Sequence, residues 1–424
     1  MKIAVIGGGG REHAIIKKLR ENSSISEIYA IPGNGGIAAD AECVDLSATD
    51  VPGVVSFCRD RGIDYVVVAP DDPLVLGMVD ALAEIGIPAF GPDKDAAVIE
   101  GSKVFSKNLM KKYHIPTAEY EVFSDPAAAY EYVKTCKIPI VIKADGLALG
   151  KGVLICMTRD EAAEAVHTIM EDHKFGKSGD EIVIEEFLEG PEVSVLSFTD
   201  GKTVVPMVSS MDHKRALDND QGLNTGGMGT IAPNPYYTSE IADRCMKEIF
   251  LPTIEAMNSE GRRFKGCLYF GLMLTKDGPK VIEYNCRFGD PETQVVLPLL
   301  DTDLLTIMQA VTEERLSEVP VSWKQEFAAC VVIASGGYPE HYEKGYEIEL
   351  PAGDHQIYVA GAAGKEGKLV TSGGRVLGVT ETAGTLKEAI GKAYKTAGQV
   401  KFKDMHMRSD IGQKALRAYA GEGR

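Results

Sequence analysis

The chain has 424 residues, of which 44% are hydrophobic and 25% are charged, as in globular proteins of two or three domains. Its formal net charge of −17 argues against general binding to nucleic acids or anionic membranes, although local lysines can still hold nucleotides. The eight cysteines form no C-x-x-C pair, and no segment approaches the length of a membrane span. We therefore expect a cytoplasmic, monomeric enzyme with reduced cysteines, whose partners are small molecules.

The first 92 residues alternate short apolar runs with segments of helical periodicity. The run Tyr65–Ala69 is continuously apolar, as in parallel strands that are buried on both faces. This alternation predicts a doubly wound α/β domain over residues 1–102. Strands are predicted at 3–6, 27–31, 65–69 and 88–90, and helices at 11–21 and 74–82.

The rest of the chain divides into two further regions. A Lys-rich helix over 103–112 leads past Pro116 into a second α/β region that extends to 325, with strands predicted at 138–144 and 181–188. The segment 209–235 is too rich in Gly, Asn and Asp to be core, so we expect a long polar loop. A smaller, strand-rich α+β domain is predicted over 326–424, with strands at 327–334, 357–360 and 376–379 and a helix near 386–398.

A glycine cluster, Gly7–Gly10, follows the first strand and opens a helix, the usual context of a phosphate-binding turn. The dinucleotide fingerprint fails, because Glu12 and His13 stand where its third glycine belongs. The second strand also ends without an acid for a ribose. A nicotinamide-dependent oxidoreductase is therefore the weaker alternative, and Gly8, Gly9 and Gly10 are candidates for another phosphate.

Two segments of the second region suit a nucleotide. A lysine at the end of a strand can reach a phosphate, and the amides of a following glycine-rich loop can cover it. The next strand ends in two acids, where backbone groups can meet an adenine and a later carboxylate can meet a ribose. Each segment alone is a weak signal, and the acids read equally well as solvated strand ends. The candidate residues are Lys143, Gly150, Lys151, Gly152, Glu185, Glu186, Phe187, Leu188 and Glu192.

The run Glu283–Gln294 follows a short apolar strand and is the most informative segment. Residues two apart on a strand point the same way, so Glu283, Asn285 and Arg287 are predicted to share one face. A carboxylate and an amide oxygen suit Mg²⁺ or Mn²⁺ beside a phosphate, and a guanidinium offers a planar fork to an oxyanion. Taken alone, the motif is better explained as a solvated strand edge with a Glu–Arg pair.

The order of these groups carries more information than any one of them. Lys103, Lys143, the glycine loop, the 185–192 segment and the Glu283/Asn285 pair together resemble the ATP-grasp superfamily. Nearly the whole chain is also similar to the phosphoribosylamine–glycine ligase family. The blocks that carry this similarity are GGGREHA (8–14), PGNGG (32–36), EGSK (100–103), IPTA (115–118), KADGLA (143–148), DHKR (212–215), NTGGMG (224–229), NCRFGDPETQ (285–294) and GGR (373–375).

The resemblance implies ATP-dependent ligation of glycine to 5-phospho-β-D-ribosylamine through a glycyl phosphate, with Mg²⁺ or Mn²⁺, in purine biosynthesis. It also implies an ATP-grasp core of two subdomains over 103–325, with a lid at about 116–190. Lys103 and Lys143 would hold phosphates, and Glu283 and Asn285 would hold the metal. Catalysis is assigned to Arg287, Lys143 and Asp290, with Asp290 and Asp212 as candidate bases. The expected substrate-binding residues are Gly8, Gly9, Gly10, Asp212, Lys214, Arg287, Asp290 and Arg375.

Some positions depart from the family pattern. Leu149 replaces an Ala in the loop, Leu223 replaces a Pro, and Asp71 replaces a frequent Glu, but none of them removes a phosphate or metal ligand. The first metal carboxylate of many ATP-grasp enzymes is absent from the run 271–275. Two alternatives stay open: an ATP-grasp ligase acting on another carboxylate or on bicarbonate, and an inactive nucleotide-binding module.

Overall fold

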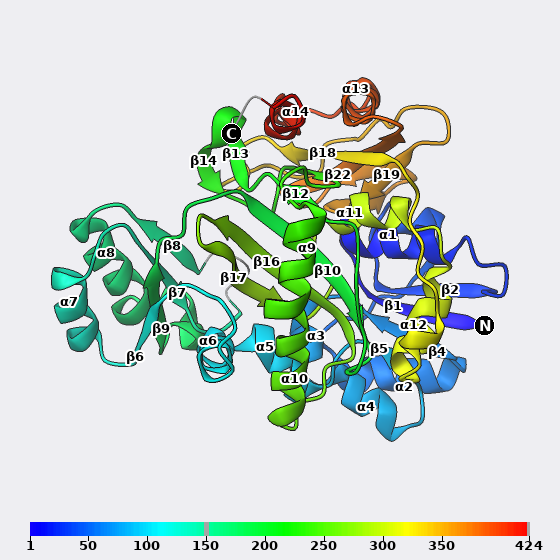
Figure 1. The fold of residues 1–424 in the computed structure, drawn as a ribbon. Helices are drawn as coiled ribbons and strands as arrows, with labels where there is room; N and C mark the ends of the chain where they lie inside the picture. The colour runs from blue at the N-terminus through cyan, green and yellow to red at the C-terminus, as the bar shows by residue number, and fades with distance from the viewer. Residues whose placement is uncertain (148–151, 422–424) are drawn as a thin grey trace.

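The structure, a computed structural model, describes residues 1–147 and 152–421. Its N-terminal part is built on a parallel sheet with the strand order β3-β2-β1-β4-β5, as predicted for a doubly wound domain (Figure 1). The strands are β1 (Lys2–Gly7), β2 (Glu27–Pro32), β3 (Glu42–Cys43), β4 (Tyr65–Val68) and β5 (Ala89–Phe90). The helices are α1 (Gly10–Leu19), α2 (Val51–Arg61), α3 (Asp71–Val75), α4 (Met78–Glu84) and α5 (Lys94–Gly101).

The predicted helix over 74–82 is in fact two helices. Gly77 separates α3 from α4 with a φ of +90°, a left-handed conformation that glycine adopts without steric cost. The turn from β1 into α1 follows the prediction more closely. There the carboxylate of Glu12 accepts a hydrogen bond from the backbone N–H of Gly9 at 2.6 Å, which caps the first turn of α1.

The lid is a four-stranded antiparallel sheet with two helices, at the left of Figure 1. The sheet has the order β6-β9-β7-β8, and it packs on its helices around a hydrophobic core of its own. Its strands are β6 (Tyr120–Phe123), β7 (Ile140–Ala144), β8 (Val153–Cys156) and β9 (Ile182–Glu186). Helix α6 (Lys103–Lys112) leads into the lid, whose own helices are α7 (Pro126–Thr135) and α8 (Arg159–Val166), the latter continued by a π-helical turn (His167–Glu171).

A second antiparallel sheet, called here the core sheet, has the order β11-β10-β16-β17. A rod of consecutive helices, from α9 to α10, runs along one side of it in Figure 1. The strands are β10 (Glu192–Thr199), β11 (Val204–Pro206), β16 (Gly266–Thr275) and β17 (Gly278–Asn285). The helices are α9 (Ser239–Cys245), a π-helical segment (Met246–Phe250), α10 (Leu251–Ser259), α11 (Thr293–Val296) and α12 (Leu304–Thr312).

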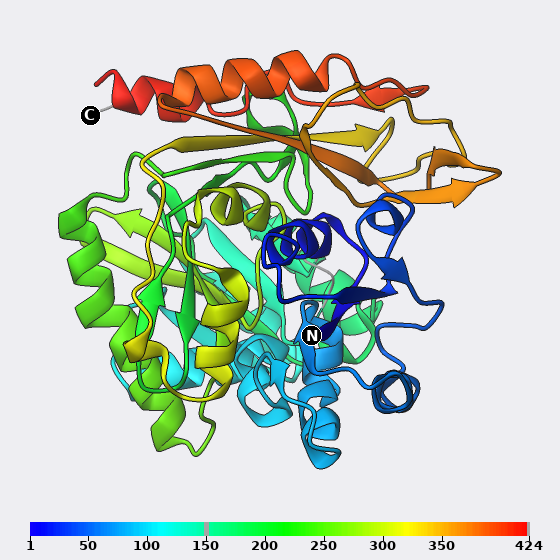
Figure 2. The same ribbon diagram turned by 90° about the vertical axis from the view of Figure 1, so that its right-hand side faces the viewer.

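The C-terminal sheet forms a separate layer, with α13 (Leu386–Ala397) and α14 (Gln413–Tyr419) on its outer side (Figure 2). Its order is β12-β15-β18-β22-β19, and β23 pairs with β18. The strands are β12 (Met211–Asp212), β15 (Gly229–Ala232), β18 (Phe327–Ser335), β19 (Gln356–Val359), β22 (Arg375–Ala383) and β23 (Met405–His406). Two hairpins flank it: β13 (Arg215–Leu217) with β14 (Gln221–Asn224), and β20 (Ala362–Lys365) with β21 (Lys368–Thr371).

The expectation of a polar loop over 209–235 is wrong. Strand β15 is fully buried and pairs antiparallel with β18, so this segment supplies two strands of the C-terminal sheet. The local composition concealed the strands of this segment, because each is at most four residues long and polar turn residues separate them.

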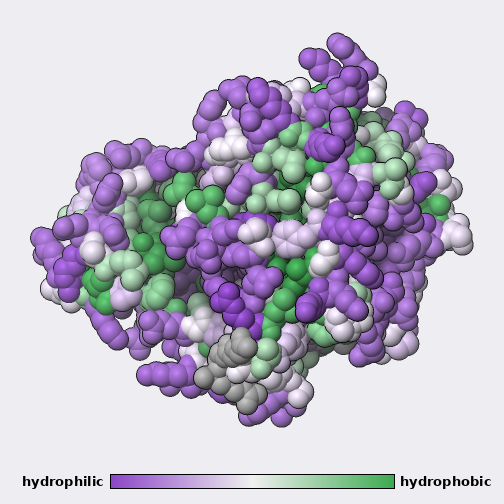
Figure 3. All heavy atoms as spheres, turned by 90° about the horizontal axis from the view of Figure 1, so that it is seen from above, coloured by the Kyte–Doolittle hydropathy of each residue, from purple (hydrophilic) through white to green (hydrophobic). Residues whose placement is uncertain are grey.

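Hydrophobic packing joins some parts of the molecule and separates others. Two hydrophobic clusters run through both the N-terminal sheet and the core sheet, and the second of them also includes residues of β15 and β18 in the C-terminal sheet. The C-terminal sheet has a further cluster of its own, and the lid has a separate core. Seen from above, the surface is mainly hydrophilic, with smaller hydrophobic patches (Figure 3). Within residues 1–147 and 152–421, no helix is long and apolar enough to cross a membrane.

Candidate active site

The two predicted phosphate lysines meet where the lid joins the core sheet. The ammonium of Lys143, on β7, donates to the carbonyl of Ile282 in β17 at 2.9 Å. Lys103 opens α6, and its ammonium donates to the carbonyl of Gly146 at 2.9 Å. Burial lowers the pKa of Lys103, and the charge of Lys143 lowers it further. The structure therefore brings both lysines to one junction, as a nucleotide phosphate would require.

Of the two acids at the end of β9, Glu185 is the one that faces the lysines. Alternation along the strand buries Glu185, which is 5% exposed, and leaves Glu186 on the surface. The Glu185 carboxylate pairs with Lys143 and, at 2.5 Å, with Lys107. Burial would raise the pKa of Glu185, but these two lysines lower it. Lys107 was not among the predicted site residues, although its i,i+4 spacing from Lys103 puts both on one face of α6.

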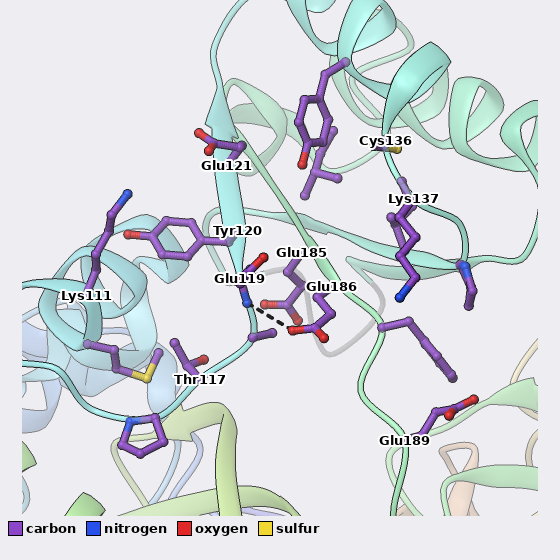
Figure 4. A pocket seen from close by; sticks show the side chains of 18 of the residues that line it. Lys111, Thr117, Glu119, Tyr120, Glu121, Cys136, Lys137, Glu185, Glu186 and Glu189 are labelled. Atoms are coloured by element: carbon purple, nitrogen blue, oxygen red, sulfur yellow. Dashed lines mark hydrogen bonds between the residues drawn. The ribbon is translucent and has the colours of Figure 1, made fainter. Parts of the chain in front are cut away.

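A cleft of about 880 Å³ borders the strand end where these acids lie. Figure 4 shows Glu185 and Glu186 side by side there, with Thr117 and Glu119 of the preceding connection next to them. The backbone N–H of Glu119 donates to Oε2 of Glu186 at 3.4 Å. The half-buried segment 187–188 continues from β9, and Phe187 lines the cleft. The cleft thus lies beside the backbone that was predicted to meet an adenine.

Glu283 and Asn285 lie two apart at the end of β17, on one face of the strand as predicted. Burial would raise the pKa of Glu283, but the charges of Lys214, Lys143 and Lys103 lower it. Its carboxylate is therefore ionised at neutral pH, and the neighbouring amide oxygen adds a second hard donor. These two oxygens fit a magnesium or manganese ion that takes its remaining ligands from phosphates and water.

Gly271 lies opposite Glu283 in the core sheet. A Cβ at Gly271 would lie 3.0 Å from Cγ of Glu283, so the side chain of Glu283 occupies the space in front of this strand. No group of three His, Cys, Asp or Glu side chains within the described residues could hold a metal by itself. The donor set is thus one carboxylate and one amide, which makes the metal dependent on the nucleotide phosphates.

Arg287 lies beyond the end of β17, so the strand alternation does not reach it. Its Nη2 pairs with Glu100 of α5 at 2.9 Å and lies 4.0 Å from Asp71 of α3. Glu100 also accepts a hydrogen bond from the backbone N–H of Cys286 at 2.7 Å. The Nε atom of Arg287 is buried and has no hydrogen-bond partner among the described residues. Arg287 therefore faces the N-terminal domain, held by carboxylates that the sequence reading did not assign to the site.

Asp290 lies between the glycine turn of the first domain and the C-terminal sheet. Gln294 donates to its Oδ1 at 2.8 Å, and Nη1 of Arg375 lies 3.3 Å from the same atom. A Cβ at Gly9 would lie 3.5 Å from its Oδ2. Burial would raise the pKa of Asp290, but Arg375 and Arg11 lower it, so the carboxylate is ionised. The structure thus brings Gly9, Asp290 and Arg375 together from three parts of the chain.

Arg375 also holds the loop that precedes β15. Its Nη1 donates to the carbonyl of Gly226 at 2.8 Å and to the carbonyl of Asp290 at 2.9 Å. The next glycine of the loop, Gly227, has a φ of +114°, and a Cβ there would lie 2.4 Å from Cδ of Pro291 and 2.6 Å from Oδ1 of Asp212. Glycine is required at this position, because the loop passes between two parts of the site.

Lys214 and Asp212 complete the cluster from the loop side. Nζ of Lys214 lies 3.3 Å from Oε2 of Glu192 and 3.9 Å from Oε1 of Glu283, next to the candidate metal ligands. Burial and the neighbouring Glu292 raise the pKa of Asp212 well above its usual range. Glu292, which the sequence reading also missed, is itself buried, and burial raises its pKa as well.

Some of the candidate residues cannot be placed. Leu149, Gly150 and Lys151 lie outside the described residues. Gly152 is described, and its carbonyl accepts a hydrogen bond from the backbone N–H of Ala144 at 2.8 Å.

An antiparallel lid sheet and a core sheet that share buried lysines, next to an acid–amide pair, define an ATP-grasp enzyme. Family models of phosphoribosylglycinamide synthetase match the chain in three parts: the N domain over residues 1–100, the ATP-grasp (A) domain over 101–293 and the C domain over 328–414. The chain belongs to the phosphoribosylglycinamide synthetase family. The predicted family and fold class are confirmed.

Relatives and a solved structure agree with this assignment. A phosphoribosylamine–glycine ligase of Clostridium acetobutylicum is 47% identical over 415 residues, which cover 97% of this chain and 100% of the relative. That of Caldanaerobacter subterraneus subsp. tengcongensis is 45% identical over 413 residues, covering 97% and 99%. The crystal structure of a phosphoribosylamine–glycine ligase from Thermotoga maritima is similar with a TM-score of 0.86 and 37% identity, and the match covers 97% of this chain and 100% of that one.

Proposed function

We propose that this enzyme joins glycine to 5-phospho-β-D-ribosylamine at the expense of ATP, giving glycinamide ribonucleotide, ADP and phosphate in purine biosynthesis. The observation that carries the proposal is the similarity to ligases of this name over 97% of the chain. It is supported by the lysines and acids of the site, which meet at one junction. The partners of this reaction are small molecules, while cytoplasmic location and a monomeric state remain predictions.

The chemistry explains why ATP is needed. A carboxylate does not acylate an amine at neutral pH, because oxide is a very poor leaving group. Transfer of the γ-phosphoryl group to glycine gives glycyl phosphate, and attack by the ribosylamine nitrogen then releases phosphate. Little covalent work is left to the protein, which acts by positioning the reactants, neutralising charge and excluding water.

The side chains of the junction take the nucleotide roles in this proposal. Lys103 and Lys143 bind phosphates, while the backbone after Glu185 meets the adenine. Glu283 and Asn285 would hold a divalent metal, Mg²⁺ or Mn²⁺, which would neutralise part of the phosphate charge. These two residues carry a single negative charge, so the remaining ligands of the metal would come from phosphates and water.

In this proposal, the residues around Asp290 interact with the ribosylamine nitrogen and with the carboxylate of glycine. Arg287 steadies the glycyl carboxylate or the charge that develops on it. Between the two candidate bases, we favour Asp212 as the acceptor of the amine proton, because burial and the neighbouring Glu292 raise its pKa and with it its affinity for a proton. Asp290 is held as an anion by Arg375, so it suits positioning better than proton transfer.

The ribosylamine phosphate is assigned to the glycine turn. Gly8, Gly9 and Gly10 stand at the N-terminus of α1, where backbone N–H groups and the helix dipole favour an anion. Arg375 adds a positive charge from the C-terminal sheet, although it also holds the Gly226 loop. Lys214 stands between Glu192 and Glu283, on the side of the nucleotide.

The test is release of ADP from ATP and Mg²⁺, with ribosylamine formed in situ from ribose 5-phosphate and ammonia, with and without glycine. We expect release that needs both glycine and ribosylamine and that matches the amide formed. Release that ignores glycine but responds to another carboxylate or to bicarbonate would overturn the substrate and keep the enzyme class. No release under any condition would favour the inactive nucleotide-binding module.

A further inference from the structure

Lys107 is the most deeply buried charge of the nucleotide junction that the mechanism above leaves without a role. It lies on α6, and 3% of its side chain is exposed. Its ammonium lies 2.5 Å from Oε2 of Glu185, donates to Oγ1 of Thr117 at 2.8 Å and reaches the carbonyl of Ala118 at 3.5 Å. Of the three N–H donors of the ammonium, two are taken by Thr117 and Ala118, and the ion pair with Glu185 occupies the remaining side. Lys107 therefore fixes the positions of neighbouring groups and is not a ligand of phosphate.

The group that Lys107 holds is shared with a predicted phosphate lysine. Glu185 pairs through Oε2 with Lys107 and through Oε1 with Lys143. Two ammonium groups and one carboxylate leave one net positive charge in the buried triad. If Lys107 were neutral, the same carboxylate would balance Lys143 completely, and in a buried site little solvent would screen that pair.

The triad also connects the lid to the core sheet. Thr117, which accepts from Lys107, donates to the carbonyl of Val281 at 2.8 Å. Lys143 donates to the next carbonyl along β17, that of Ile282. These two carbonyls directly precede Glu283, the candidate metal ligand. The positions of both lysines are thus fixed against the strand that carries the metal site.

We propose that Lys107 is a positioning residue for the nucleotide. It compensates the negative charge of Glu185, so that the positive charge of Lys143 stays available to the nucleotide phosphates. The proposal deepens the proposed function and rests on it for the identity of the nucleotide. It makes Lys107 necessary for nucleotide affinity although Lys107 touches no phosphate.

The surroundings of Lys107 add a dependence on pH. The groups that face it are Glu185 on β9, Lys143 on β7, Lys280 on β17 and the ring of Tyr120 on β6, whose centroid is 5.5 Å away. Burial lowers the pKa of Lys107 to about 8, with Glu185 opposing this shift and Lys143 adding to it. Nucleotide affinity should therefore fall as the pH rises through about 8, where Lys107 loses its proton.

Calorimetric titration with ADP and Mg²⁺, without glycine or ribosylamine, tests the proposal. We expect Lys107→Met to bind ADP about tenfold to 100-fold more weakly than the wild type, as for loss of a buried charged partner. Lys112→Met is the matched control: it removes a lysine from the same helix, but one that is 62% exposed and pairs with Glu260 at the surface. The control should bind ADP like the wild type.

Two further measurements separate this role from a purely structural one. The double variant Lys107→Met/Glu185→Gln should regain part of the lost affinity, because the carboxylate that would balance Lys143 has lost its charge. The wild type should also lose more affinity than Lys107→Met between about pH 7 and pH 9.

Unchanged ADP affinity in a folded Lys107→Met variant would overturn the proposal, and so would a double variant as weak as the single one. If Lys107→Met does not fold, the wild-type pH series decides, and a flat profile counts against the proposal. Because ADP binding needs neither of the other substrates, intact binding without ligation would overturn the proposed function and leave this inference standing.

Discussion

At the scale of single residues, different surroundings shift the pKa values of two aspartates of the site in opposite directions. Arg375 and Arg11 offset the effect of burial on Asp290 and lower its pKa. Burial and Glu292 raise the pKa of Asp212. One carboxylate is thus stabilised as an anion and the other has a raised affinity for a proton, which is the usual way in which paired acids take different roles.

The metal assignment is tested by Glu283→Ala. We expect turnover to fall by about 100-fold or more, because the variant loses the only carboxylate assigned to the metal. Asp277→Ala is the control, since Asp277 is an exposed residue in the turn of the same β16–β17 hairpin. ADP titrations at several Mg²⁺ concentrations give a readout apart from turnover: the benefit of Mg²⁺ should shrink in Glu283→Ala. Near-normal turnover at limiting Mg²⁺ would contradict the assignment.

At the scale of elements, the β13–β14 hairpin is fixed to the C-terminal sheet by buried charge. Arg408, which is 1% exposed, donates from Nε and Nη2 to the two oxygens of Asp410 at 2.7 and 2.8 Å. Its Nη1 donates to the carbonyl of Arg215 in β13 and to Asp220 at the hairpin turn, both at 3.1 Å. The hairpin immediately precedes the Gly226 loop, so this anchor supports the loop that passes over the site.

The anchor should respond to acid. Burial would raise the pKa of Asp410, but Arg408 lowers it from 3.8 to about 2. Since the folded pKa lies below the unfolded one, the stabilisation is complete above pH 3.8 and is lost as the pH falls toward 2. We expect Asp410→Asn to cost about 2 kcal/mol at neutral pH.

Hydrogen exchange of the amides of residues 215–224 measures this effect at the hairpin itself. Exchange should be faster in Asp410→Asn than in the wild type at neutral pH, and the difference should shrink as the wild-type carboxylate is protonated. The amides of the lid, which has its own core, serve as an internal control. Equal exchange in the hairpin of both proteins at neutral pH would show that Asp410 does not anchor it.

At the scale of the whole molecule, one residue of β19 ties the C-terminal layer to the first domain. The backbone N–H of Val359 donates to Nδ1 of His13 at 2.8 Å, and its carbonyl accepts from Asn34 at 2.8 Å. Asn34 also donates to the carbonyl of Gly8 at 2.9 Å, next to the predicted phosphate turn. Because Nδ1 of His13 accepts a hydrogen bond from the backbone N–H of Val359, Nε2 carries the ring hydrogen and donates to Asp40 at 2.9 Å.

This contact predicts that the two domains separate more easily in mild acid. Burial lowers the pKa of His13 below 6.5, with Lys17 adding to the shift and Asp40 opposing it. The stabilisation from the neutral ring is therefore complete above pH 6.5 and is lost as the pH falls through the lower folded pKa. Protonation of Nδ1 would also remove the acceptor of Val359, at a cost of about 1 kcal/mol.

Thermal unfolding at about pH 5 and pH 7.5 measures the effect in the wild type and in His13→Gln. We expect the midpoint of the wild type to drop more on acidification than that of the variant, which has no group titrating there. An equal drop in both proteins would show that the acid sensitivity arises elsewhere.

Much of this molecule could be predicted from local pattern. The apolar runs of the first domain became β1, β2, β4 and β5, and the Lys-rich segment became α6 with the predicted bounds Lys103–Lys112. The candidates for phosphate and metal were also chosen from local position, because Lys103, Lys143, Glu283 and Asn285 stand at strand ends or a helix start, and their roles remain predictions. Periodicity and position within an element are local properties, and a sequence displays them directly.

The tertiary structure decided which of these groups meet and how they are charged. It turned Glu185 rather than Glu186 toward the lysines, added Lys107 to them, and gave Arg287 two carboxylate neighbours from the first domain. It also drew β12 and β15 out of an apparent loop into the C-terminal sheet. Pairings of this kind join residues far apart in the chain, and burial shifts their pKa values only once the surrounding elements have packed. A local pattern carries neither these long-range pairings nor the pKa shifts. The sequence alone therefore determined which chemical groups are present, but not which of them are in contact.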